Sequence, residues 1–157
     1  MKKLILISGI AAFLVACSGG TEKTETADNT NAASDLMKDD AAKADARGVG
    51  KFTDVKVDPK LDEKMATDGK GIYDLKCSAC HRLTNEKLVG PGWMGVTSRR
   101  KAEWIMNFAT NTDEMLNKDA EAQAMLEVCM VRMPNQNLSD DDARKVYEFM
   151  RKNDGVK

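Results

Sequence analysis

The residues with the clearest chemical meaning are Cys77-Ser78-Ala79-Cys80-His81. Two cysteines separated by two residues and followed by a histidine are the pattern for covalent attachment of a c-type haem. Each thiol can add to one vinyl group of the haem, and the two-residue spacing lets one helical turn present both thiols. The histidine then lies beneath the iron and supplies a neutral imidazole nitrogen as the proximal ligand. The pattern predicts one covalently bound haem c.

The same residues have two alternative interpretations besides chance, a structural zinc site and a redox-active pair of thiols. A structural zinc site normally takes four ligands from cysteine and histidine, but the other cysteines are Cys17 near the start and Cys129 far downstream. A thioredoxin-like thiol pair belongs in a βαβ context, and the sequence shows none. The pattern therefore favours haem attachment. Cys129 is then expected to be a buried free thiol, which behaves as a small hydrophobic side chain.

The second axial ligand of the iron must come from another part of the chain, or the site is open. His81 is the only histidine, which excludes two histidines of one chain and leaves methionine, lysine, the amino terminus, Cys129 or an open site. Most of the ten methionines lie at helical spacing, where packing in the core is the ordinary role. Met133 differs because Pro134 follows it in a loop, which ends the helix and lets the thioether point inward. We therefore predict Met133 as the second ligand, and a thioether opposite His81 would raise the haem potential.

The loop after the haem motif contains Gly90-Pro91-Gly92-Trp93. A ligating histidine usually donates its other ring N–H to a carbonyl oxygen, which fixes the ring and raises its basicity. Pro91 keeps its carbonyl acceptor while lacking an N–H, and it is our candidate partner for His81. Trp93 is expected either at the haem edge or in the ordinary core.

The start of the chain has the features of an export signal. Two lysines at positions 2 and 3 precede an almost wholly apolar run from Leu4 to Val15, which is too short for an ordinary membrane-spanning helix. The run ends in Leu14-Val15-Ala16-Cys17, which looks like a bacterial lipobox. We expect removal of residues 1–16 and stable anchoring through acyl chains on Cys17; an ordinary signal peptide with an incidental cysteine is the alternative. The protein is therefore expected in the cell envelope, lipid-anchored to a bacterial membrane, with the haem domain facing the periplasm.

Residues 17–47 are expected to form a lipid-anchored flexible linker. They consist mainly of Thr, Ala, Asp, Asn, Ser, Lys and Glu, and such a segment cannot bury enough apolar surface to offset the entropy of ordering it. The whole chain carries 24 basic and 25 acidic residues, and no basic patch indicates nucleic acid. Arg99 and Arg100 are expected to be solvated surface charges, with bonding to a haem propionate as the alternative. The remaining residues, 48–157, are predicted to form one small haem domain.

The haem domain is predicted to be helical after an extended start. Residues 49–57 are β-branched and partly alternating, which indicates one extended strand or arm. The spacing of apolar residues indicates helices over residues 61–76, 101–109, 118–131 and 139–155, with a turn over residues 110–113. In the first of these helices, Gly69 and Gly71 each cost about 1 kcal/mol relative to alanine. They either admit the close approach of another backbone, or one of them separates two shorter helices.

These features together resemble class I monohaem cytochrome c. The resemblance rests on the motif at 77–81, Gly90-Pro91, Met133-Pro134 and a terminal helix with aromatic residues. It covers roughly residues 61–153. It implies a small all-α fold of about four to five helices around one covalent haem c, which the disordered linker precedes.

The resemblance also implies roles for single residues. Cys77 and Cys80 would carry the thioether bonds, His81 and Met133 would be the axial ligands, and Pro91 would contact His81 through its carbonyl. The terminal helix would cross the helix that contains Gly69 and Tyr73.

Three stretches, residues 88–97, 103–107 and 133–138, look like the lipoprotein cytochromes associated with nitrous oxide reductase in Bacteroidetes-like bacteria. This resemblance implies a membrane-tethered one-electron carrier, not an enzyme, that serves a respiratory donor and a terminal reductase. We expect a monomer that docks briefly through a small interface. The alternatives are a gas sensor or peroxidase-like enzyme with an open sixth site, and a haem subunit of a larger complex. The lack of a second histidine counts against peroxide chemistry, and the lone tethered domain favours a mobile carrier.

Overall fold

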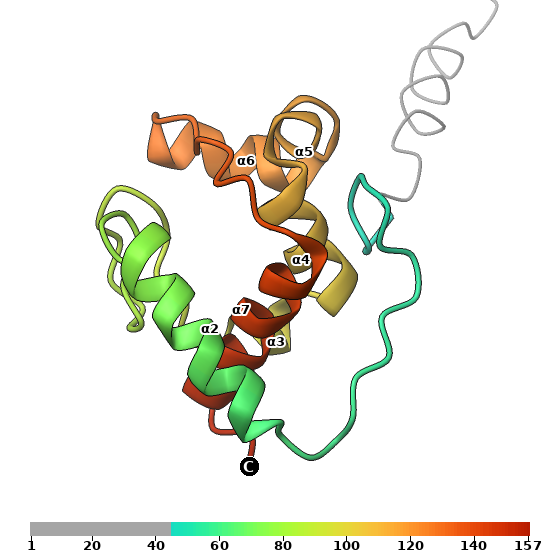
Figure 1. Ribbon diagram of the computed structural model, residues 1–157. Coiled ribbons are helices and arrows are strands. Elements are labelled where there is room, and N and C mark those ends of the chain that lie inside the picture. The colour runs from blue at the N-terminus through green and yellow to red at the C-terminus, as the bar shows by residue number, and fades with distance from the viewer. Residues whose placement is uncertain (1–44) are drawn as a thin grey trace, which may run out of the picture. The chain divides into compact units, whose positions relative to one another are not determined.

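Two long helices, α2 (Glu63–Lys76) and α7 (Asp140–Asn153), pack across each other at the centre of the domain (Figure 1). The structure is a computed structural model and describes residues 45–157. Four shorter helices lie between them in the chain, α3 (Val96–Arg99), α4 (Ala102–Thr110), α5 (Thr112–Lys118) and α6 (Ala120–Cys129). Residues 45–157 contain no β-strand, only a bridge between His81 and Lys87. The predicted all-α class is confirmed.

The predicted leader, the lipidation site Cys17 and nearly all of the predicted linker lie outside the described residues. Only residues 45–47 of the linker are described. The backbone oxygen of Arg47 accepts a hydrogen bond of 2.9 Å from Asn107 Nδ2, so the contacts of the domain include residues before Gly48. Within residues 45–157, no helix is long and apolar enough to cross a membrane.

The crossing of α2 and α7 depends on Gly69. A Cβ atom at this position would lie 2.0 Å from the backbone oxygen of Lys145, so only glycine lets the two helices approach this closely. The ring centroid of Tyr73, one turn later, lies 5.3 Å from that of Phe149 on α7. The structure thus supports close approach at Gly69. The same interpretation is wrong for Gly71, which would meet no atom within 4 Å and lies inside an unbroken helix.

The short helices α3 and α5 are absent from the sequence-based expectation. α5 lies partly where a turn was predicted, because Thr112 is fully buried and donates a hydrogen bond of 2.9 Å to the backbone oxygen of Phe108. This bond lets α4 pass into α5 with one residue between them. Asp119 then ends α5 and caps α6 by accepting a hydrogen bond of 2.9 Å from Ala122 N, so α6 starts later than residue 118.

The single turn of α3 is held by the carboxylate of Asp154, just beyond α7. Its oxygens accept hydrogen bonds from the backbone nitrogens of Gly95 at 2.6 Å and Thr97 at 2.9 Å. Because these partners are separated by more than fifty residues in the sequence, no local pattern indicates this helix.

Residues 48–60, which we call the arm, are extended but do not form the strand that was one of two expectations (Figure 1). The arm bonds to helix side chains in place of a neighbouring strand. Asn107 of α4 accepts a hydrogen bond from Phe52 N at 3.0 Å and donates one to Phe52 O at 2.9 Å. Glu103 of the same helix accepts one from Val55 N at 2.8 Å. The arm is therefore fixed to the domain through side chains of α4.

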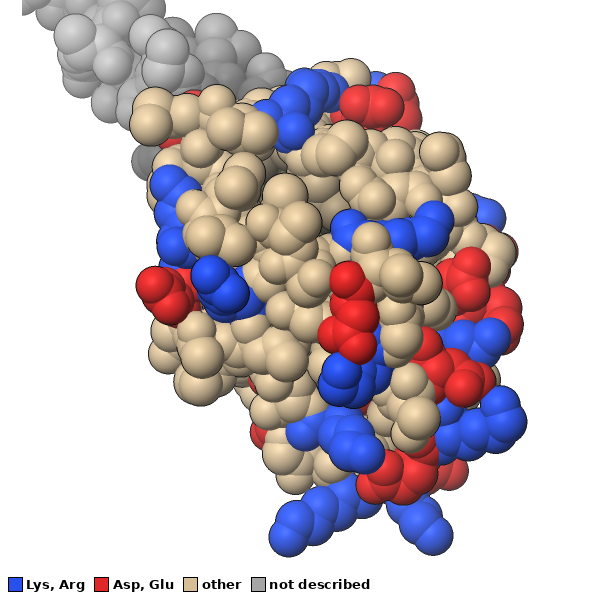
Figure 2. Space-filling view, turned by 60° about the vertical axis from the view of Figure 1, so that its left-hand side comes forward, with Lys and Arg blue, Asp and Glu red and all other residues tan. Residues whose placement is uncertain are grey.

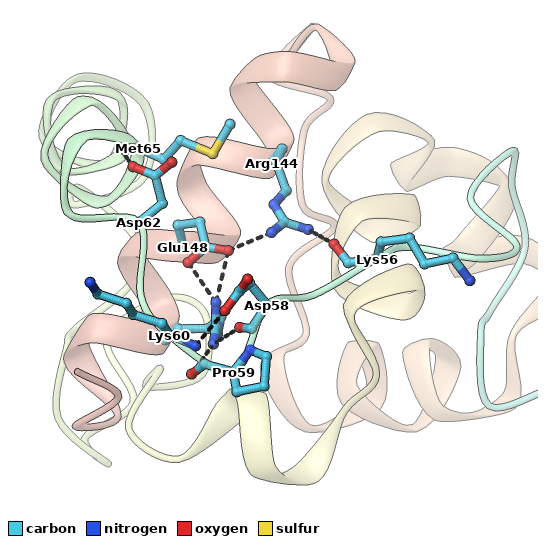
Figure 3. Close-up of polar contacts among 9 residues, drawn as sticks. Lys56, Asp58, Pro59, Lys60, Asp62, Met65, Arg144 and Glu148 are labelled. Atoms are coloured by element: carbon cyan, nitrogen blue, oxygen red, sulfur yellow. Dashed lines mark hydrogen bonds and ion pairs between the residues drawn. The ribbon is translucent and has the colours of Figure 1, made fainter.

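The end of the arm is bound by a buried ion-pair cluster on α7 (Figure 3). Glu148 is fully buried and accepts hydrogen bonds from Arg144 at 2.6 Å and from Arg151 at 2.8 and 2.9 Å. Arg151 also donates to the backbone oxygens of Asp58 at 2.6 Å and Pro59 at 3.1 Å. A buried carboxylate requires such partners, because its desolvation is costly without them. The arm thus supplies part of the shell that satisfies these charges.

Candidate functional site

One cavity brings together residues from distant parts of the described chain. Cys77, Cys80, His81, Pro91 and Met133, the five residues predicted for the site, all line it. Cys77, Cys80, His81 and Pro91 come from the end of α2 and the loop that follows, whereas Met133 comes from the connection between α6 and α7. The remaining lining is mainly apolar and includes Trp93, Ile105, Phe108, Leu116, Leu126 and Met150.

The imidazole of His81 is held in one orientation. Its Nδ1 lies 2.9 Å from the backbone oxygen of Pro91, so Nδ1 carries the proton and Nε2 keeps a lone pair. Tyr73 Oη donates a hydrogen bond of 2.8 Å to the backbone oxygen of His81. A Cβ atom on Gly90 would lie 2.3 Å from His81 Cε1, so glycine is required beside the ring. These contacts leave Nε2 as the nitrogen available for ligation.

Burial also favours the neutral imidazole. His81 is buried, and this desolvation lowers the pKa of the ring below its ordinary value, although the Pro91 carbonyl acts in the opposite direction. The ring of Trp93 covers His81, with 5.4 Å between the two centroids. Trp93 is itself buried in the core and also lines the cavity.

Backbone hydrogen bonds fold the motif into a tight turn at the end of α2. The backbone nitrogens of Cys80 and His81 donate to the backbone oxygen of Cys77 at 3.0 and 2.9 Å. The backbone nitrogen of Gly90 returns to the oxygen of Cys80 at 2.9 Å. The two-residue spacing therefore places both thiols and the imidazole on one turn, with the Gly-Pro loop folded against it.

The environment of the two cysteines does not match a redox-active thiol pair. Cys77 and Cys80 are free thiols, and burial raises the pKa of Cys77 to about 11. A reactive cysteine has a lowered pKa, because the thiolate is the nucleophile. Among the described residues, no group of three or more His, Cys, Asp or Glu side chains could hold a metal ion.

Cys129 differs from its prediction as a buried thiol. It is the last residue of α6, is partly exposed and lines the cavity. The helix ends there because Met130 adopts a left-handed conformation, with φ of 57°, and this exposes the end of α6.

The charged residues of the cavity lining are all cationic. Arg99, Arg100 and Arg132 line it, and none of its lining residues is Asp or Glu. The prediction of a solvated charge is wrong for Arg100, which is half-buried 4.9 Å above the Trp104 ring and pairs with Glu121 at 2.6 Å. Arg132 was not predicted, and its only signal in the sequence is its position beside Met133. Cationic lining suits a ligand that carries carboxylates.

A sequence comparison with known families decides the identity of this fold. The cytochrome c family profile matches residues 66–154, which is more than half of the chain. The protein belongs to the cytochrome c family. Among curated proteins, none matches this cytochrome significantly.

Solved structures support the same conclusion. Cytochrome c from Rhodothermus marinus is 28% identical to this cytochrome, with a TM-score of 0.68 over 73% of this chain and 98% of that chain. An engineered variant of the Rhodothermus marinus protein, Rma TDE, has a TM-score of 0.67 at 28% identity over 71% and 96% of the two chains. The same variant bound to a carbene intermediate has a TM-score of 0.64, with the same identity and coverage.

Membership of the family implies one covalently attached haem c, and the cavity fits this group. The lining contains two free thiols, an imidazole whose Nε2 is available and a thioether. Its apolar walls suit the porphyrin ring, and its arginines suit the two propionates. This cytochrome is thus a class I monohaem cytochrome c.

Proposed function

We propose that this protein is a one-electron carrier in which His81 and Met133 bind the haem iron from opposite faces. Cys77 and Cys80 would hold the haem by thioether bonds, and Pro91 would fix the imidazole of His81. The observation that carries this proposal is that His81 and Met133, 52 positions apart, line the same cavity as both cysteines. The family itself supports electron transfer.

The haem, when bound, supplies an iron that accepts and releases one electron. The residues of the chain determine how readily this happens. The Pro91 carbonyl keeps His81 oriented, and the buried rings of Tyr73 and Trp93 exclude water beside it. Two protein ligands that stay in place in both oxidation states keep the reorganisation on electron transfer small. Thioether ligation by Met133 raises the potential relative to a second imidazole.

The partner would dock at the mouth of the cavity. Exposed apolar side chains gather in two segments, one directly after Lys87 and one that starts at Val128. A hydrogen bond between Lys87 and Val128 joins the two segments. These side chains are Leu88, Val89, Val128, Met130 and Val131, of which Val89 and Val131 also line the cavity. Figure 2, turned toward the side of α6 and the loop after α2, shows a largely uncharged area with both basic and acidic side chains around it. A small apolar contact of this kind suits a weak and brief encounter with a redox protein.

The setting of this carrier is proposed from the sequence. The Leu14–Cys17 lipobox supports a lipid anchor on Cys17, with residues 17–47 as a linker to a domain that faces the periplasm. The resemblance over residues 88–97 and 133–138 supports a respiratory terminal reductase as partner, with nitrous oxide reductase as the candidate. Cys17→Ser is expected to move the holoprotein from the membrane fraction to the soluble fraction, and unchanged retention in the membrane would contradict the anchor.

Optical spectra of the holoprotein test the ligation. The oxidised protein should show the methionine-to-iron charge-transfer band, and the reduced protein should not respond rapidly to carbon monoxide. Met133→Ala should abolish the band and open the iron to carbon monoxide. Met125→Ala is the matched control, since Met125 also lines the cavity but lies within α6, and it should keep the band. A high-spin spectrum or rapid carbon monoxide binding by the unmodified protein would favour a sensor or enzyme with an open site.

A further inference from the structure

The segment that carries Met133 has little backbone support. Residues 131–138, which we call the ligand loop, make no backbone–backbone hydrogen bond to the rest of the described chain. Two non-glycine residues in residues 45–157 have a positive φ. They are Met130, directly before the loop, with 57°, and Asn137, within it, with 51°. For methionine this left-handed conformation is unfavourable. The ligand loop therefore depends on side chains to stay in place.

Two lysines that flank the haem motif in the chain contact this loop and the helix before it. Lys76 Nζ, at the end of α2, donates a hydrogen bond of 2.9 Å to the backbone oxygen of Gln136 in the ligand loop. Lys87 Nζ, in the loop after the haem motif, donates one of 3.1 Å to the backbone oxygen of Val128 in the last turn of α6. We call these two bonds the cross-cavity contacts. They join the wall that contains the motif to the wall that contains Met133.

The positions of both lysines suit this role. Lys76 directly precedes Cys77, so its backbone is fixed next to a thioether attachment point. Lys87 faces a carbonyl oxygen in the last turn of a helix, where intrahelical partners are absent and the helix dipole favours a cation. Both side chains are exposed, so each bond is weaker than a buried one and can break and reform.

We propose that Lys76 and Lys87 are positioning residues that hold the ligand loop closed over the cavity and so keep Met133 on the iron. This inference rests on the proposed ligation by Met133. Loss of either contact increases the fraction of time that the loop is open. The rate at which an added ligand reaches the iron then rises in proportion, because Met133 must leave before the ligand can bind.

The test measures carbon monoxide association with the reduced holoprotein by stopped flow. Lys76→Met and Lys87→Met remove the donor but keep most of the apolar stem. Each is expected to increase the association rate roughly two- to fivefold, and the two effects should multiply in the double variant. Lys70→Met is the matched control. It removes the same charge from α2, but Lys70 pairs only with Asp74 on its own helix, so the rate should stay unchanged.

Rescue and exchange measurements separate positioning from charge. Lys76→Arg keeps a cationic donor and should restore a rate close to that of the unmodified protein. Amide hydrogen exchange in residues 131–138 should accelerate in the Lys→Met variants and not in Lys70→Met. If the association rate stays unchanged in the double variant while the charge-transfer band still depends on Met133, the result overturns the proposed role of the lysines but not the ligation by Met133. Loss of that dependence overturns the proposed ligation instead.

Discussion

The arm and the ligand loop are both segments without helix or strand, but they are attached to the domain in opposite ways. The arm is bound by Asn107, which has no exposed surface, and by Arg151, which is almost as buried. Arg151 is in turn paired with the fully buried Glu148. The ligand loop is attached by Lys76 and Arg132, whose hydrogen bonds are exposed. The same kind of irregular backbone is therefore fixed by buried partners on one side and by solvated partners on the other.

The energetic difference follows from burial. A buried donor or acceptor that loses its partner costs about 1–3 kcal/mol, and more when it is charged. An exposed contact between side chains contributes at most about 1 kcal/mol, because water replaces the lost partner. The arm should therefore leave the domain only when the domain unfolds, whereas the ligand loop can open in the folded protein. This arrangement suits a site that keeps α4 and α7 fixed and adjusts only near Met133.

The largest loss of stability is expected when the buried ion-pair cluster that binds the end of the arm is broken. Glu148→Ala leaves Arg151 buried without its carboxylate partner, and the free energy of unfolding should fall by about 3–5 kcal/mol. Guanidinium denaturation of the holoprotein, followed by far-UV circular dichroism, measures the change. The charge-transfer band of the folded variant should remain, because Glu148 does not line the cavity.

An exposed ion pair between α7 and α2 provides the control. Lys152 of α7 pairs with Glu63 at 2.7 Å, with side chains 47% and 67% exposed. Glu63→Ala should change the free energy of unfolding by at most about 1 kcal/mol. Equal losses of the free energy of unfolding in Glu148→Ala and Glu63→Ala would show that burial does not determine how much these ion pairs contribute to stability.

A smaller effect is expected for Asn107→Ala. The substitution removes the acceptor of Phe52 N and the donor to the backbone oxygens of Phe52 and Arg47. We expect a loss of about 2 kcal/mol, partly offset by the better helix propensity of alanine. Limited proteolysis should also cut within residues 48–57, since the arm loses its central attachment.

Asn117 supplies the corresponding control on the side of the ligand loop. It is exposed on α5, and its Oδ1 accepts a hydrogen bond of 2.8 Å from Arg132. Asn117→Ala should leave the denaturation midpoint nearly unchanged. A loss as large as that of Asn107→Ala would mean that the ligand loop is as firmly attached as the arm.

Most residues of the candidate site could be named from the sequence, because the signals that mark them are local. The motif at 77–81 needs two-residue spacing on one turn, and Pro134 distinguishes Met133 from the methionines at helical spacing. The Pro91 carbonyl could be named because Pro91 lies only ten positions after His81. Arg132 was missed, and contact with a propionate was only the alternative for Arg99 and Arg100, since these arginines come together with the motif only through the tertiary fold.

The partners of the arm could not be predicted from any pattern. Asn107 bonds to arm residues that lie 55 to 60 positions before it in the chain. Glu148 acts on the arm only through Arg151, which bonds to the backbone at residues 58 and 59. The turn expected at residues 110–113 was wrong for a similar reason. Its polar composition hides Thr112, which is fully buried and bonds back to α4.

The smallest expected effect is a pH dependence of stability at Tyr147, which lines a surface pocket together with Val55 and Val57 of the arm. Tyr147 of α7 is buried, and desolvation raises the pKa of its phenol above the ordinary value of about 10, although Arg151 and Arg144 oppose this shift. The folded state therefore prefers the neutral phenol. Its contribution to stability is fully present below pH 10, which is the pKa in the unfolded chain, and is lost as the pH rises through the higher folded pKa. The unmodified holoprotein should thus lose stability relative to Tyr147→Phe above pH 10, as measured by denaturation at several pH values. If the difference in free energy of unfolding between the two proteins stays constant from pH 8 to beyond pH 11, the phenol does not ionise preferentially on unfolding. Tyr147 would then be better solvated than its burial indicates.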